Sequence, residues 1–127
     1  MDGDSERRAR GLEAYASQFQ MAPEEVAERM TEAFGARFAE EAISAAGGAW
    51  PDDALSLRDR SLIVVAALIT QGGVSQRLRT HVRWAIDHGA TREELEAVTT
   101  LLGVYAGFPR ASVGMEIVRD ELDQLGV

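Results

Sequence analysis

An uninterrupted apolar run, Leu62 to Ile69, constrains the fold of this chain more than any other segment. Its eight consecutive apolar residues are too uniform for a helix that keeps one face in water, so the segment is expected to be buried. Periodicity alone cannot separate a buried helix from a buried strand. No second segment resembles a strand that could pair with it, and Ser56 with Asp59 at the third position resembles a capping box. We therefore predict a buried central helix.

A second helix is predicted after Gly72 and Gly73, with Ser75 as its N-cap. His81 belongs to two overlapping stripes of this helix. One is apolar, and the other is basic and aromatic and contains Arg77, His81, Trp84 and His88. Two interpretations of His81 stay open: a core histidine bonded to a backbone carbonyl, or a histidine at the rim of a pocket.

The rest of the chain also favours helices. Upstream, helical spacing predicts one helix over residues 7–19, one that begins at Pro23, and one around Phe38 that extends as far as Gly47-Gly48. Downstream, Gly89 is placed to end the second central helix, the Thr91–Glu94 capping box begins another helix, and Pro109 begins the last. The helix after Thr91 is expected to bury Leu95, Val98, Leu102 and Tyr105.

One connection is irregular, at residues 50–53. Its Trp50 is either a plug over the core or a wall of a ligand pocket, because the indole ring is large and rigid. We predict an all-α bundle of six to seven helices that forms one domain over residues 1–127. The core motif region is expected at 55–125, and residues 1–8 are expected to be frayed.

Composition excludes several classes of function. A net charge of −8 argues against a nucleic-acid partner, and all 13 basic residues are arginine, which removes Schiff-base chemistry. Cysteine is absent, and the two histidines have no metal-ligand spacing, so we expect no metal site. No apolar run is long enough to span a membrane and no secretory signal opens the chain, so we expect a soluble, cytoplasmic protein. Cofactor-free acid–base chemistry or simple binding remains.

Four spaced motifs resemble the carboxymuconolactone decarboxylase family. They are Arg60-Ser61-Leu62 at the start of the buried helix, Leu78 to His81, Gly89 to Glu94, and Tyr105 to Ala111, which reads YAGFPRA. The resemblance is strong from Leu55 onward and weak before it. It implies an all-α subunit of the alkylhydroperoxidase-D-like type that assembles into a closed ring, a homotrimer or a homohexamer.

The resemblance leaves two branches to compare. The peroxidase branch uses a CxxC pair seven and four residues before the histidine, and those positions are Val74 and Arg77 here. With no thiol in the chain, disulfide-based peroxide reduction is excluded. The other branch decarboxylates γ-carboxymuconolactone without a cofactor, in a route of aromatic-compound catabolism.

The decarboxylase branch suggests roles for particular residues. His81 is the expected proton donor and Tyr105 a second one, although a buried tyrosine that only satisfies its hydroxyl group is an equal alternative. Substrate carboxylates are expected to bind Arg58, Arg60 and Arg77. The alternative interpretation of each arginine is a solvated charge on the surface of its helix. The expected walls of the site are Trp84 and Trp50.

Three positions depart from the decarboxylase pattern. Arg77 stands where an acidic residue is common, Trp84 where a small residue is common, and Ser112 where asparagine is common. These departures weaken the inference of substrate more than that of fold. We therefore hold two hypotheses: a cofactor-free lyase that acts on a small carboxylated lactone or related unsaturated acid, and a non-catalytic ring-forming protein that binds a small ligand or acts as a scaffold.

Overall fold

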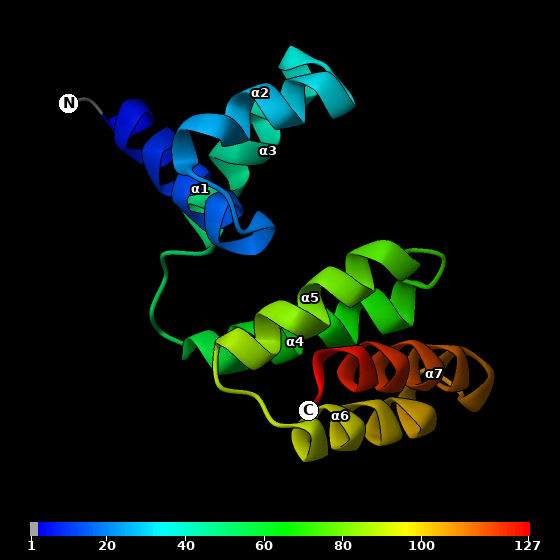
Figure 1. Ribbon diagram of the computed structural model, residues 1–127. Helices are drawn as coiled ribbons and strands as arrows, with labels where there is room; N and C mark the ends of the chain where they lie inside the picture. Colours follow the sequence, from blue (N-terminus) through cyan, green and yellow to red (C-terminus); the bar gives the residue numbers. More distant parts are fainter. Residues whose placement is uncertain (1–2) are drawn as a thin grey trace. The chain divides into compact units, whose positions relative to one another are not determined.

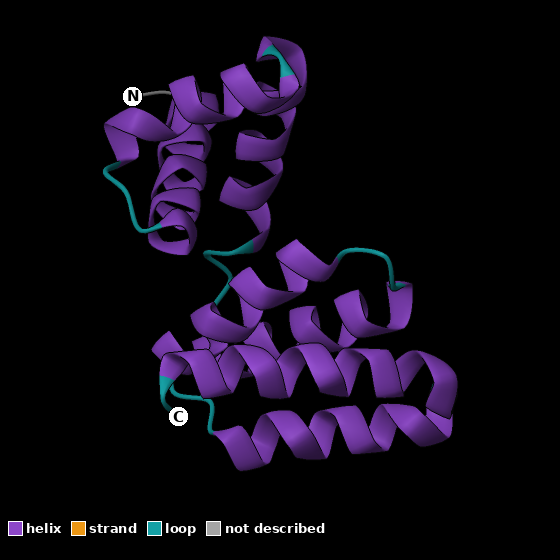
Figure 2. Cartoon of the chain, turned by 45° about the vertical axis from the view of Figure 1, so that its right-hand side comes forward, coloured by secondary structure: helices purple, strands orange, loops and turns teal. Residues whose placement is uncertain are grey.

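The computed structural model describes residues 3–127, whose packing divides them into two compact units. Unit 1 extends to Ala54 and unit 2 covers Leu55–Val127. Seven helices and no strand occur among the described residues, which confirms the all-α prediction (Figure 2). The assignment of the whole chain to one domain stays a prediction. Within residues 3–127, no helix has both the length and the apolar character needed to cross a membrane.

Unit 1 is a three-helix unit formed by α1 (Gly3–Phe19), α2 (Pro23–Phe34) and α3 (Ala36–Ala49) (Figure 1). The helix α1 begins before Arg7, so residues 3–8, which were predicted to be frayed, are helical, whereas Met1 and Asp2 lie outside the described residues. Helices α1 and α3 pack very closely, because a Cβ atom at Gly11 would come within 1.8 Å of the backbone oxygen of Ile43. Small side chains therefore set the spacing of these two helices.

Unit 2 contains α4 (Leu57–Gln71), α5 (Ser75–Asp87), α6 (Arg92–Tyr105) and α7 (Phe108–Leu125). Helix α4, the predicted central helix, packs against the other three (Figure 1). Its buried side carries Ser61, Val65 and Ile69, but Ile63 is 55% exposed. The expectation of a helix buried on all sides is therefore wrong for this unit, because its neighbours cover only part of the circumference of α4.

Local sequence signals explain most of the helix ends. Asp59 donates its backbone N–H to the Ser56 hydroxyl at 3.1 Å, and Thr91 and Glu94 form both bonds of a capping box. Gly89 follows α5 at a positive φ of 99°, as predicted. The prediction of Ser75 as an N-cap is wrong: Val74 holds that position without a side-chain bond, because the chain is already helical at Ser75 after the glycine turn.

Candidate active site

Three aromatic side chains lie in a row along α5. The ring centroids of His81 and Trp84 are 5.8 Å apart, and those of Trp84 and His88 are 4.7 Å apart. Trp84 is buried at 3% exposure, whereas the two histidines are half-buried. The three ring-bearing members of the predicted stripe thus form a contact series in which the indole ring separates the two imidazoles, whereas Arg77 is not part of these ring contacts.

Helix α4 holds the end of this row through a buried hydroxyl group. The Oγ of Ser61 lies 2.7 Å from Nδ1 of His88, and Ser61 is only 1% exposed. A serine hydroxyl can donate to a ring nitrogen or accept from its N–H, so this bond holds the orientation of the imidazole in either neutral tautomer. Ser61 therefore orients His88 and, through the indole ring of Trp84, which is tilted against both imidazoles, supports the packing around His81.

Burial keeps both imidazoles neutral at neutral pH. Loss of hydration, and secondarily the positive charge of Arg83, lowers the pKa of His81 from 6.5 to about 4. Burial is also the main cause that lowers the pKa of His88; Asp87 opposes this change, whereas Arg60 and Arg83 add to it. At neutral pH, His81 thus presents one N–H donor and one acceptor nitrogen, with Nδ1 buried.

Comparison with known proteins identifies the family of the chain. Residues 24–120 match the model of the carboxymuconolactone decarboxylase family. The chain belongs to this family. It is also similar to 4-carboxymuconolactone decarboxylase from Acinetobacter baylyi, at 30% identity over 81 residues. That similarity covers 64% of this chain and 60% of the relative, so the chain spans less than two thirds of the relative's length.

The two arginines on α4 that the family resemblance suggested lie in different surroundings. Arg58 bonds to Glu94 at 2.7 Å and to Asp59 at 3.2 Å, so neighbouring carboxylates already neutralise its charge. Arg60 is half-buried and donates Nε–H to the backbone oxygen of Leu55 at 2.7 Å. Because Arg60 also lowers the pKa of His88, it is the arginine of this pair whose charge reaches the row of rings.

Two arginines on α5 lie on either side of His81 in the sequence. Arg77 is exposed, and its side chain makes no hydrogen bond or ion pair among residues 3–127. Arg83 was not among the predicted site residues, yet its charge lowers the pKa of His81, and it pairs with Asp87 at 2.6 Å. Arg83 lies outside both stripes of the predicted helix, so helical spacing gave no sign of this role.

Two further predicted site residues lie at the C-terminal ends of helices. Tyr105 is 83% exposed at the end of α6, so its assignment to the buried side of that helix is wrong. Its side chain lies away from the face of α6 that packs on the other helices of unit 2. Trp50 is half-buried and directly follows α3 as its C-cap residue in unit 1. The helix continues up to Trp50, so the irregular connection begins after this residue and not at it.

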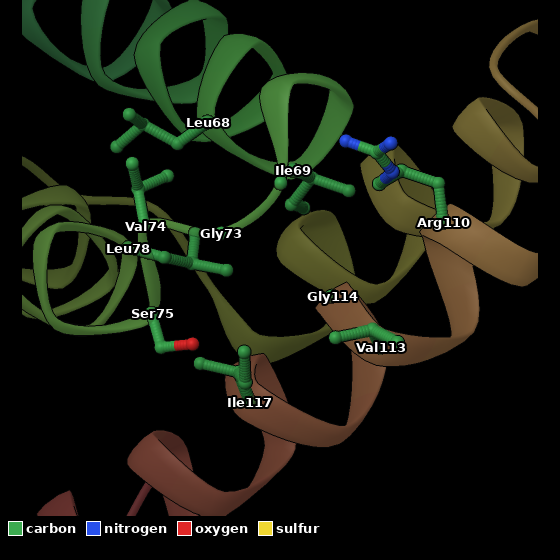
Figure 3. Close-up of a pocket in the computed structure, with 11 residues that line it drawn as sticks. Leu68, Ile69, Gly73, Val74, Ser75, Leu78, Arg110, Val113, Gly114 and Ile117 are labelled. Atoms are coloured by element: carbon green, nitrogen blue, oxygen red, sulfur yellow. The ribbon is translucent and has the colours of Figure 1, made fainter.

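Two cavities of unit 2 have linings that do not include His81. The smaller, of about 20 Å³, lies between α4, α5 and α7 beside Val74, the first of the two positions where the peroxidase branch carries thiols (Figure 3). Arg110 lines it and donates to the backbone oxygens of Thr70 and Gln71 at the end of α4. With room for about one water molecule, this cavity cannot hold a carboxylated lactone.

The second cavity is an open groove of about 580 Å³ over α6 and α7. It contains no histidine, and the row of rings is separate from it. Among residues 3–127, no cluster of three or more histidine, cysteine, aspartate or glutamate side chains could hold a metal ion. At the row of rings, the imidazoles can take part in proton transfer, and the nearby charges of Arg60 and Arg83 can act on a bound anion.

Proposed function

We propose that this protein is a cofactor-free carboxy-lyase that decarboxylates a small carboxylated lactone or a related unsaturated acid. The observation that carries the proposal is the half-buried imidazole of His81, whose pKa of about 4 marks a site partly shielded from water. Family membership and the similarity to 4-carboxymuconolactone decarboxylase supply the reaction class.

The reaction needs an anion-binding group and a proton donor. When the carbon–carbon bond to the carboxylate breaks, carbon dioxide leaves and the electron pair enters the conjugated lactone as a dienolate. A cation near the remaining carboxylate and the dienolate oxygen stabilises this charge. Arg60 and Arg77 serve this role most readily, because Arg58 must first give up its ion pair with Glu94.

The substrate itself prepares His81 for proton transfer. Without a ligand, His81 is neutral at pH 7 because burial and Arg83 lower its pKa. A bound carboxylate adds a negative charge that opposes both effects and raises the pKa again. The imidazole then takes up a proton as the substrate binds and donates it to the carbon of the dienolate after carbon dioxide leaves.

An absorbance screen of unsaturated lactone acids tests this proposal. Wild type is expected to deplete one of these compounds, and His81→Gln is expected to lower the rate about 10²–10⁴-fold, the usual contribution of general acid–base catalysis. Gln76→Ala, at an exposed position on the same helix, is the matched control and should retain the wild-type rate. Turnover by His81→Gln at the wild-type rate would exclude His81 as the donor.

A second candidate is binding of a carboxylate ligand without catalysis. It is favoured by the ion pairs that occupy Arg58 and by the position of both cavities away from His81. Calorimetric titration with the same compounds separates the two functions. Binding that depends on Arg60 and Arg77, with no change in absorbance over hours, supports the binding protein and contradicts the lyase.

Assembly into a closed homo-oligomer, a trimer or a hexamer, is part of this proposal. Many large apolar side chains of the described residues are exposed, and such a surface on one subunit usually marks an interface. Light scattering in dilute buffer tests the assembly, and a stable particle at the 13.8 kDa mass of one chain contradicts it.

A further inference from the structure

The indole ring of Trp84 lies between the two imidazoles of α5. Trp84 is only 3% exposed, although it belongs to the same stripe as His81 and His88, which are both half-buried. Its ring centroid lies 5.8 Å from that of His81 and 4.7 Å from that of His88, and the ring planes are tilted by 59° and 47°. Centroid separations of this size place the rings in contact. The largest side chain of the stripe is therefore also its most buried one.

Contacts on both sides hold the indole in this position. At one end of the row, the Ser61 hydroxyl lies 2.7 Å from Nδ1 of His88 and joins that imidazole to α4. Next to Trp84 on α5, Val82 and Ala85 are fully buried in the core of unit 2, so the helix cannot rotate to turn the indole outward without exposing them. The indole is thus a fixed part of the site.

The fixed indole limits what can lie against His81. Nδ1 of His81 is buried, so a ligand meets the imidazole at the remaining part of its ring, next to the indole. A ligand that extends along the row toward His88 needs the space that the indole occupies. Close-packed interiors have few voids that could receive a displaced ring, and neither of the two cavities described above is lined by Trp84. The size of a ligand at His81 therefore depends on this side chain.

We propose that Trp84 is the specificity-determining residue of the site at His81, where its indole excludes acids larger than one ring. A one-ring acid binds beside the indole, whereas a fused two-ring acid is rejected because it must displace a packed side chain. Replacement of Trp84 by a small residue opens a recess between His81 and His88 that receives the second ring. The inference rests on the proposed function, because it needs a carboxylate that binds at His81, but it does not depend on the decarboxylation step.

Calorimetric titration with benzoate and 2-naphthoate tests the proposal, because these acids share a carboxylate and differ by one fused ring. Wild type should bind benzoate more tightly than 2-naphthoate. Trp84→Ala should change the ratio of the two dissociation constants in favour of 2-naphthoate by about tenfold or more. Trp84→Phe, which keeps a smaller aromatic ring, should give an intermediate ratio. A folded Trp84→Ala variant with the wild-type ratio overturns the proposal.

A substitution in the core of unit 1 is the matched control. Met30→Ala removes a large side chain that is 2% exposed in that core, so it creates a cavity away from the row of rings. It should lower the melting temperature and keep the wild-type ratio of dissociation constants. If Trp84→Ala also lowers only the melting temperature, Trp84 has a structural role alone and the proposal is overturned. Should Trp84→Ala fail to fold by circular dichroism, Trp84→Leu takes its place.

Added indole tests the recess without any acid. An apolar cavity binds apolar molecules of matching shape, and Trp84→Ala leaves a recess of the shape of the missing ring. Indole should raise the melting temperature of Trp84→Ala and restore its preference for benzoate, with no effect on wild type or Met30→Ala. An equal effect of indole on all three proteins overturns the assignment of the recess to Trp84.

Failure of the proposed function and failure of this inference give different results. A wild type that binds benzoate but turns over no lactone acid contradicts only the lyase, and the ratio of dissociation constants still tests Trp84. A wild type that binds neither acid contradicts the carboxylate site and the inference together. Benzoate binding that is unchanged in His81→Gln places the acid away from His81 and overturns the inference.

Discussion

The two units of this chain differ in where their ionisable groups lie. In unit 1 the ion pair of Arg8 and Glu40 lies on the surface, and the half-buried Tyr15 has its pKa raised by burial, so it stays protonated at neutral pH. Unit 2 instead holds two half-buried imidazoles with lowered pKa values. In unit 1, α1 and α3 make a close helix contact, whereas unit 2 combines a core with two imidazoles that burial keeps neutral at neutral pH. This difference is why the candidate site is assigned to unit 2.

The largest expected effect on stability concerns the close helix contact of unit 1. Gly11→Ala places a Cβ atom against the backbone oxygen of Ile43, so α1 and α3 must separate, at a cost of about 3 kcal/mol of unfolding free energy. Each unit contains one tryptophan, so Trp50 fluorescence in a Trp84→Phe background reports on unit 1. Gly3→Ala, which meets open space, is the control. An equal effect of both substitutions contradicts the close contact.

A smaller effect is a dependence of stability on pH, which we expect in unit 2 and not in unit 1. Both histidines lie in unit 2, and the folded pKa of His81 is about 4 against 6.5 in the unfolded chain. Between these values the unfolded state binds more protons, so stability is present above pH 6.5 and is lost as the pH falls toward 4. From pH 7 to pH 5 the expected loss is about 2 kcal/mol.

Denaturant melts followed by the fluorescence of Trp84, in a Trp50→Phe background, measure this loss. His81→Gln should remove most of it, and His88, whose pKa is also lowered, should account for the remainder. The transition of unit 1 should show no histidine-dependent change over the same range. A pH dependence that persists in full in His81→Gln shows that His81 is not the group responsible.

The hydrogen bond between α4 and α5 is expected to contribute about 1–2 kcal/mol. Ser61→Ala leaves Nδ1 of His88 without its hydroxyl partner in a buried setting, which lowers the free energy of unfolding and changes the titration of His88. Thr99→Val is the matched control, because the buried Thr99 hydroxyl bonds only to the backbone of its own helix, at Leu95. An NMR titration in which both variants shift His88 equally contradicts the role of Ser61.

The smallest effect tests a helix end. Thr91→Ala removes the side-chain half of the capping box at the start of α6 and should cost about 1 kcal/mol. Ser75→Ala should cost less, because Ser75 is the first residue of α5 and not its N-cap. Thermal melts of the two variants compare a cap that the structure contains with one that the sequence alone suggested. Equal melting temperatures contradict this distinction.

Much of the fold can be predicted from local sequence signals. Pro23, Ser56, Gly89 and the Thr91–Glu94 box each fix a helix end through contacts within a few residues. The stripe of His81, Trp84 and His88 was also predictable, because helical spacing places these positions on one side. Burial was harder to predict: Tyr105 and Ile63 have apolar character, yet both are exposed, because burial depends on which neighbours cover a helix face.

The sequence by itself determined an all-α chain, most of its helix ends, the absence of thiol and lysine amine nucleophiles, and the family that the chain belongs to. Only the tertiary structure decided that Ser61 bonds to His88, that Arg58 is occupied by Glu94, and that burial lowers the pKa of His81. These contacts join residues that lie far apart along the chain or depend on what excludes water. Spacing rules describe one helix at a time, whereas desolvation and partner choice depend on how several helices pack together.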